Sequence, residues 1–159
     1  MFSEFFGSFY CWLFEDFFGL DLAEYMWGKA SEYQTSNMFV SIGLTMFVIS
    51  LAIMLLYYYV INHPRLCNLW GWLIFLGSNV IVNFIVGWQW TLRHLYEGYM
   101  VYKDANGNEV ALNVDEWNCV NFGISNSILS VVLFIAFTYM FKWWSVNCWP
   151  APENTFFKR

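Results

Sequence analysis

The fold of this chain is decided by residues 38–61, which read MFVSIGLTMFVISLAIMLLYYYVI. This run contains no Asp, Glu, Lys or Arg, and about 20 apolar residues are enough for a helix to cross the hydrocarbon core of a bilayer. Inside lipid, every backbone N–H and C=O must be paired within the segment. We therefore expect a transmembrane helix over 38–61, although its β-branched and aromatic content would favour a strand in water.

Two further uncharged runs follow, and they predict transmembrane helices over 66–92 and 119–143. The whole chain of 159 residues is 59% hydrophobic and only 12% charged, whereas soluble domains have about 25% charged residues. A compact soluble domain of this length has too much surface to hide so many apolar side chains. This composition excludes an ordinary soluble enzyme, a disordered tail and a disulfide scaffold. The net charge of −5 argues against a nucleic-acid partner.

The connections between the expected spans have different lengths. Pro64 ends the first span, because the residue before a proline is driven out of the helical region. The connection from 93 to 118 is long enough to form a small β-hairpin, with Asn106 and Gly107 supplying the positive φ angles of its turn. The expected fold is thus an all-α integral membrane protein of three transmembrane helices, with a β-hairpin between the second and the third.

The region 1–37 is acidic and aromatic, and it does not have the positively charged start of a signal peptide. Polar side chains at Glu4, Ser8, Cys11 and Glu15 recur at helical spacing along one face. The other side carries Phe2, Phe5, Phe6, Phe9, Leu13 and Phe17. We expect an amphipathic interfacial helix that Gly19 ends, and a shorter helix capped by Asp21. Because the region is acidic, aromatic burial or a partner protein would have to hold it at the membrane.

Tryptophans lie near the ends of the second and third expected spans. Indole rings favour the headgroup layer of a bilayer, so these residues are interpreted as interfacial anchors. They are Trp70, Trp72, Trp88, Trp90, Trp143 and Trp144.

Orientation follows from the basic residues. The side of the C-terminal tail, 144–159, has one more Lys or Arg than the opposite side. The rule that cytoplasmic loops are richer in basic residues favours the tail inside by this small margin. A bacterial inner membrane and a mitochondrial inner membrane both fit the composition.

Polar side chains also occur within the expected spans. An amide without a partner is costly in lipid, so these side chains should face protein or water. They are interpreted as helix-packing or pore-lining residues: Ser78, Asn79, Asn83, Asn121, Asn126 and Ser130. We favour packing, either with Asn79 and Asn83 meeting Asn126 and Ser130 within a protomer or with pairing between protomers. Lining of a hydrated path is the alternative.

No pattern of residues predicts catalytic, metal or cofactor chemistry. His63 and His94 fall on opposite sides of the bilayer in this topology, so one ion or haem cannot bind both. The cysteines are at 11, 67, 119 and 148, without CxxC or zinc spacing. Disulfides between Cys11 and Cys119 and between Cys67 and Cys148 are one alternative, and free thiols are the favoured one. No cofactor is expected, apart from bound lipids.

Three functions remain from the sequence. The leading hypothesis is a non-catalytic accessory or structural subunit of a larger membrane complex, with other subunits or copies of itself as partners in the lipid bilayer. The alternative is a homo-oligomeric channel or pore-forming effector whose Asn and Ser faces line the lumen. A membrane enzyme that uses His94 and Glu97 as an acid–base pair carries the least weight.

Overall fold

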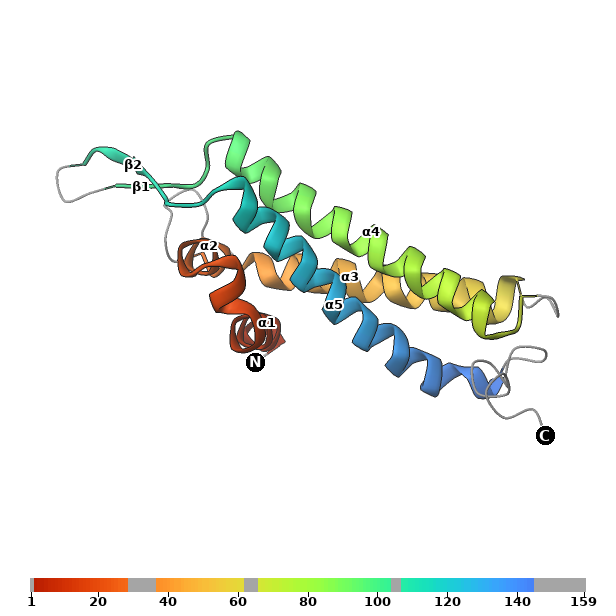
Figure 1. Cartoon of the computed structure of the whole chain (residues 1–159). Helices are drawn as coiled ribbons and strands as arrows, with labels where there is room; N and C mark the ends of the chain where they lie inside the picture. Colours follow the sequence, from red (N-terminus) through yellow and green to blue (C-terminus); the bar gives the residue numbers. More distant parts are fainter. Residues whose placement is uncertain (1, 29–36, 62–65, 104–106, 145–159) are drawn as a thin grey trace. The chain divides into compact units, whose positions relative to one another are not determined.

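The computed structural model describes residues 2–28, 37–61, 66–103 and 107–144. Helices dominate this part of the chain, together with a two-stranded antiparallel hairpin, as the sequence predicts (Figure 1). The elements in chain order are α1 (Phe2–Phe18), α2 (Leu20–Met26), α3 (Met38–Leu55), the π-helix η1 (Leu56–Ile61), α4 (Leu69–Tyr96), β1 (Val101–Lys103), β2 (Glu109–Ala111), α5 (Glu116–Phe141) and the 3₁₀-helix η2 (Lys142–Trp144).

Three of the helices are long and apolar enough to cross a membrane: Met38–Ile61, Leu69–Tyr96 and Glu116–Phe141. The second continues one turn beyond the predicted end at 92. The reason is local, because Arg93 Nε donates to Glu97 Oε1 at 2.6 Å, and an i,i+4 ion pair supports a helical turn. The third begins at Glu116 and not at 119, with the acidic side chain in its first turn, where the helix dipole favours a negative charge.

The starts of α2 and α4 illustrate two ways of beginning a helix. Gly19 precedes α2 with φ 94°, a value that favours glycine. Asp21 lies in the first turn, so the prediction that Asp21 caps this helix is wrong, although the predicted break at Gly19 is present. At α4, the side chain of Asn68 accepts the backbone N–H of Gly71 at 2.8 Å, as a helix cap does. The predicted break at Pro64 lies outside the described residues.

The chain divides into two compact units, and α3, α4 and α5 each contribute one part to both. Unit 1 comprises residues 1–45 and 84–126, and unit 2 comprises residues 46–83 and 127–159. Every Asp and Glu in the described ranges belongs to unit 1.

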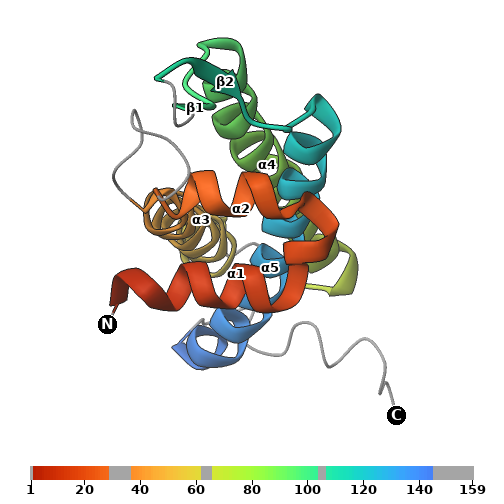
Figure 2. The same ribbon diagram turned by 90° about the vertical axis from the view of Figure 1, so that its left-hand side faces the viewer.

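Unit 1 is built around four buried aromatic rings. Tyr10 of α1 stacks on Phe39 and Phe122 with centroid distances of 5.4 and 5.6 Å, and Phe18 meets Phe122 edge-on at 5.5 Å. Figure 2 shows α1 and α2 folded back against each other. The indole N–H of Trp27 after α2 donates to Sγ of Cys11 in α1 at 3.2 Å. Aromatic packing of this kind stabilises beyond the burial of area alone.

The hairpin of unit 1 pairs Val101 with Ala111 and Lys103 with Glu109. Gly107 has the positive φ of 81° that the predicted turn requires, while Asn106 lies outside the described residues. The strands are mostly exposed, and a two-stranded hairpin alone is marginally stable in water. Its base is held by the backbone N–H of Leu112, which donates to the carbonyl of Met100.

Unit 2 has its own core, in which the π-helix takes part. Tyr57 and Tyr58 of η1 are fully buried and pack with Met54, Phe134 and Phe137. The hydroxyl of Tyr57 also donates to the carbonyl of Leu66 at 3.2 Å. The π-helix therefore places two adjacent tyrosines in the same core, while α3 and α5 supply the other side chains.

Candidate functional site

An open groove in unit 1, with a volume of about 590 Å³, lies along the last turns of α4. Its lining residues on α4 recur every three or four positions, which places them along one side of the helix. Thr45 of α3 completes the lining. The α4 residues are Val86, Gln89, Trp90, Arg93, His94 and Glu97. We call this feature the α4 groove.

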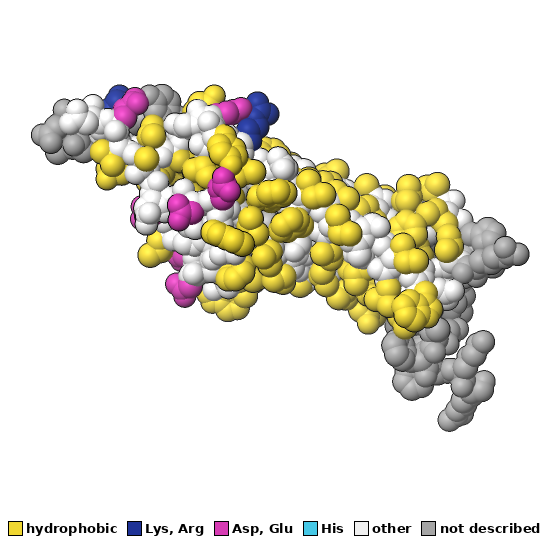
Figure 3. All heavy atoms as spheres, turned by 45° about the horizontal axis from the view of Figure 1, so that its top comes forward, with side chains coloured by type: hydrophobic (Ala, Val, Ile, Leu, Met, Phe, Trp, Pro, Cys, Tyr) yellow, Lys and Arg dark blue, Asp and Glu magenta, His cyan; other side chains and the backbone are white. Residues whose placement is uncertain are grey.

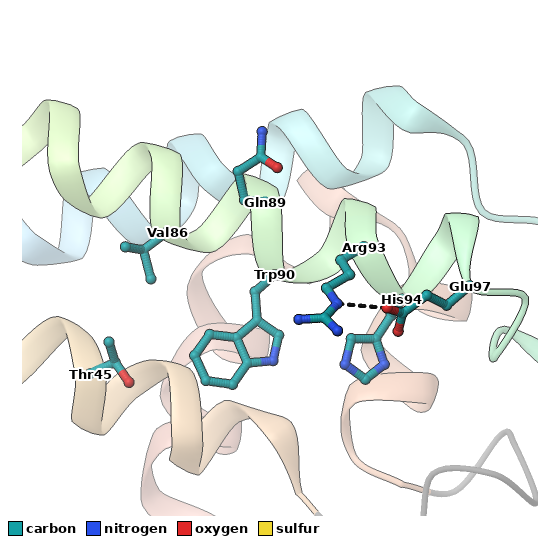
Figure 4. A pocket seen from close by; sticks show the side chains of 7 residues that line it. All are labelled: Thr45, Val86, Gln89, Trp90, Arg93, His94 and Glu97. Carbon is teal, nitrogen blue, oxygen red and sulfur yellow. Dashed lines mark hydrogen bonds and ion pairs between the residues drawn. The ribbon is translucent and has the colours of Figure 1, made fainter.

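Polarity changes along the α4 groove (Figure 4). Val86 and Thr45 lie at one end, and the side chains of Trp90, Arg93 and His94 lie next to one another toward the other end. Glu97 follows and forms the ion pair with Arg93. The groove therefore passes from apolar side chains, through an indole, to a cation and then a carboxylate. Arg93 is 76% exposed and Glu97 is 36% exposed, so both charges are accessible.

His94 is held from the side of α2. The hydroxyl of Tyr25 shares a hydrogen bond of 2.8 Å with Nδ1 of His94, and the two rings meet edge-on at 6.0 Å. Burial, together with the nearby Tyr99 and Glu97, raises the pKa of Tyr25 to about 12. Tyr25 therefore keeps its proton at neutral pH. The ring of Tyr99 contacts His94 from the hairpin side at 5.6 Å.

The same contacts bear on the hypothesis of an acid–base pair. In the described part of the chain, the ion pair of Glu97 is with Arg93, while Nδ1 of His94 faces Tyr25. Each of the two side chains thus has a structural contact of its own.

The asparagines of α4 lie in a buried polar cluster of unit 2. Nδ2 of Asn79 donates to the carbonyl of Ser130 in α5 at 3.1 Å. Nδ2 of Asn83 donates to the carbonyl and to Oδ1 of Asn79 at 2.9 and 3.0 Å, and it lies 3.5 Å from Oγ of Ser50 in α3. All four residues have zero exposure. We call Ser50, Asn79, Asn83 and Ser130 the polar cluster.

The other predicted polar residues lie elsewhere. Asn126 belongs to unit 1 and accepts a hydrogen bond from the hydroxyl of Tyr10 at 2.5 Å. Asn121 donates to the carbonyl of Phe17 at 2.9 Å. Both asparagines thus connect α5 to α1, a role that the sequence did not indicate. Ser78 is exposed, and its hydroxyl donates to the carbonyl of Ile74 one turn earlier.

Two residues of these networks were missed by the sequence analysis. Ser50 interrupts the apolar run of α3, and that interruption is a signal that could have identified it. Tyr10 gives no such signal, since its partner Asn126 is 116 positions away in the chain.

The six predicted tryptophan anchors differ in exposure. Trp70 and Trp143 are 72% and 65% exposed. Trp72 is half-buried, and its indole N–H donates to Oγ1 of Thr138 at 3.1 Å. Trp88 stacks on Phe84, and its indole nitrogen is buried with no hydrogen-bond partner among the described residues. Trp90 lines the α4 groove. The side chain of Trp144 lies outside the description.

Cysteines and histidines form no metal site within the described ranges, since no group of three or more potential ligands occurs there. Cys11 and Cys119 are not disulfide-bonded. Cys67 is disulfide-bonded, so the expectation of a free thiol is wrong for this residue. Cys148 and His63 lie outside the described residues.

The chain matches no protein family model, no curated protein and no solved structure.

Proposed function

We propose that this chain is an integral membrane protein that acts as a non-catalytic structural or accessory subunit of a larger membrane complex. The observation that carries the proposal is the division between polar and apolar side chains on the long helices. The side chains of the polar cluster are buried, and the amide groups of Asn79 and Asn83 donate hydrogen bonds to other members of it, whereas large apolar side chains point outward. A surface of this kind requires lipid or protein against it.

The outward surface of the long helices supports membrane placement. Large exposed apolar side chains occur on all three: among them are Leu44, Val48, Ile74, Ile81, Ile85, Val132 and Ile135. Figure 3 shows hydrophobic side chains spread over much of the face in view. In lipid such a surface costs nothing to expose, whereas in water it would promote aggregation.

The first helix supports a role in assembly. Tyr10 and Phe18 of α1 are buried in unit 1, so the core already occupies one side of this helix. Its other side exposes Phe9, Leu13 and Phe17, and above all Trp12, which is 79% exposed. Aromatic residues of this kind are enriched at protein interfaces. We infer that this side of α1, defined by Phe9, Trp12, Leu13 and Phe17, packs against another subunit.

The burial of the asparagines favours packing over the alternative of a pore. A residue that lines a hydrated lumen must be accessible to water, but Asn79, Asn83 and Asn126 have zero exposure within a single chain. Interhelical hydrogen bonds of this kind stabilise helix association in lipid. We therefore assign these residues to helix packing.

The disulfide of Cys67 bears on orientation. Disulfides persist in oxidising compartments, whereas cytosolic thiols stay reduced. A single extra basic residue at the tail is a weaker indication. We therefore propose that the Cys67 end faces the oxidising side, with the hairpin and Cys11 on the cytoplasmic or matrix side. This reverses the orientation that the basic residues favour, since the tail lies on the same side as Cys67 in a three-span topology.

Native electrophoresis of the full chain in mild detergent tests the proposed function. We expect a discrete band well above the mass of the chain, and Trp12→Ser combined with Phe17→Ser should release the chain from it. Trp70→Ser is the matched control, because Trp70 is similarly exposed but lies on α4. Two differently tagged copies distinguish self-association from association with other subunits. Migration of the wild-type chain as a lone small species would count against the proposal.

A further inference from the structure

We propose that the α4 groove binds one zwitterionic aminophospholipid, whose headgroup carries a phosphate followed by a primary ammonium. The phosphate contacts Arg93, the ammonium contacts Glu97, and the glycerol and the start of an acyl chain lie against Trp90 and Val86. This inference depends on the proposed membrane placement of α4, and it adds a specific lipid site to it.

The order of side chains along the groove is the first reason. α4 rises about 1.5 Å per residue, so the groove from Val86 to Glu97 is about 16 Å long. Val86 lies deeper in the span, and Glu97 directly follows the last residue of α4. A phospholipid in the same leaflet presents its acyl chain, its phosphate and its amine in the same order from the bilayer centre outward. The apolar, cationic and anionic positions of the groove therefore match it.

The charges at the outer end are the second reason. The exposed guanidinium of Arg93 uses Nε for Glu97, and its terminal amino groups provide further donors for phosphate oxygens. Glu97 lies where the C-terminal carbonyls of α4 add a partial negative charge. An ammonium is favoured there, and a second anion is repelled.

These charges also select between headgroups. A choline headgroup has no N–H to donate to the Glu97 carboxylate, and a glycerol headgroup brings a net negative charge without a cation. The primary ammonium supplies both the charge and the donors. Among the groups around the site, Tyr25 stays protonated and adds no charge at neutral pH.

Indole and apolar contacts complete the groove. Figure 4 shows Trp90 next to Arg93 on the side of α4 that faces Thr45, while Gln89 points away from them. Tryptophan favours the level of the headgroups and the glycerol, so Trp90 provides an apolar surface directly below the charged end. Nδ1 of His94 is already hydrogen-bonded to the hydroxyl of Tyr25. This contact holds the imidazole ring of His94 in place as part of the groove lining.

Native mass spectrometry of the full chain tests this site. The chain is loaded with an equimolar mixture of phosphatidylethanolamine, phosphatidylcholine and phosphatidylglycerol of identical acyl chains, and the first bound lipid is identified. We expect about a fivefold preference for phosphatidylethanolamine, the scale of one charge-assisted hydrogen bond that is partly exposed to water.

Charge variants separate a specific site from general attraction. Arg93→Gln and Glu97→Gln should each reduce the preference to near equality. The exchange variant, Arg93→Glu with Glu97→Arg, keeps the net charge and an i,i+4 pair but reverses their order, and it should lose the preference as well. Lys103→Gln is the matched control, since it removes one positive charge from the exposed hairpin outside the groove, and it should keep the preference.

The contradicting results are distinct. Equal binding of the three lipids, a preference for phosphatidylglycerol, or a preference retained by the exchange variant would overturn the lipid site. Flotation with vesicles gives the separate readout for membrane placement. A chain that floats but shows no lipid preference overturns the site alone, whereas a chain that does not float overturns both proposals.

Discussion

The hydroxyl of Tyr10 in α1 donates a hydrogen bond to Oδ1 of Asn126 in α5, and both side chains are fully buried. The two residues are 116 positions apart in the chain. Burial also raises the pKa of Tyr10 well above its ordinary value, so the phenol keeps the proton that it donates. The amphipathic N-terminal helix is thereby attached to the first half of the third long helix.

Replacement of Tyr10 by Phe should weaken this attachment. The ring and its stacking are retained, but the amide oxygen of Asn126 loses a buried donor, which costs about 1–3 kcal/mol. The free energy of unfolding in detergent, followed by circular dichroism, measures the loss. Tyr102→Phe is the control, because Tyr102 is 41% exposed on the hairpin, and it should be nearly neutral. Equal effects of the two substitutions would show that the hydrogen bond does not stabilise the fold.

Adjacent residues of α4 provide a second test. Asn79→Ala removes the donor to the Ser130 carbonyl and the acceptor for Asn83. We expect a loss of about 0.5–2 kcal/mol, the range of interhelical hydrogen bonds in membrane proteins. Ser78→Ala removes an exposed hydroxyl that bonds only its own helix among the described contacts, so it should change stability little. Thermal unfolding in the same detergent compares the two variants.

An ion-conductance measurement distinguishes helix packing by Asn79 and Asn83 from a pore that these asparagines line. If the asparagines pack helices, liposomes with the purified wild-type chain should show no ion leakage beyond that of empty liposomes. Leakage that Asn79→Leu abolishes would contradict the assignment to packing and would favour a pore.

Substitution by alanine should have opposite effects on stability at two glycines of α4. A Cβ at Gly71 would lie 1.9 Å from the carbonyl oxygen of Leu66, so the backbone must shift, at a cost of about 1–3 kcal/mol. A Cβ at Gly77 would meet nothing within 4 Å, and alanine has the higher helix propensity by about 1 kcal/mol. Gly71→Ala should therefore lower the melting temperature, and Gly77→Ala should maintain or raise it. A tolerated Gly71→Ala would contradict the close approach of Leu66.

Thiol labelling tests the proposed orientation. Glu109→Cys introduces a thiol on the exposed hairpin, and Leu66→Cys introduces one next to Cys67. With intact cells and a membrane-impermeant maleimide, we expect labelling at position 66, and at position 109 only after permeabilisation. The reverse pattern would place the tail inside, as the basic residues favour.

The long helices were predictable because lipid solvation acts on composition, which is visible in the sequence. The first span matches the predicted bounds of 38–61 because it is uncharged throughout. α4 extends beyond the predicted end at 92, because the first charged residue does not end the helix. Arg93 and Glu97 instead pair along the helix and extend it.

The α4 groove and the Tyr10–Asn126 contact were not predictable in the same way. The residues of the groove recur at helical spacing, but nothing in that spacing indicates that Thr45 of another helix lies opposite them. The burial of Asn126 against α1 depends on how α1 packs, which composition does not determine. The disulfide of Cys67 likewise depends on tertiary proximity.

The π-helical turn over Leu56–Ile61 has a consequence for how this segment tolerates changes in length. Bonding from i to i+5 encloses one more residue in each hydrogen-bonded loop than the i to i+4 bonding of the α-helix, and it here brings Tyr57 and Tyr58 into one core. Deletion of a single residue at its far end would let the turn tighten into regular α-helix without rotating Met38–Leu55. The π-helical segment would then tolerate the loss of one residue while the preceding helix keeps its orientation.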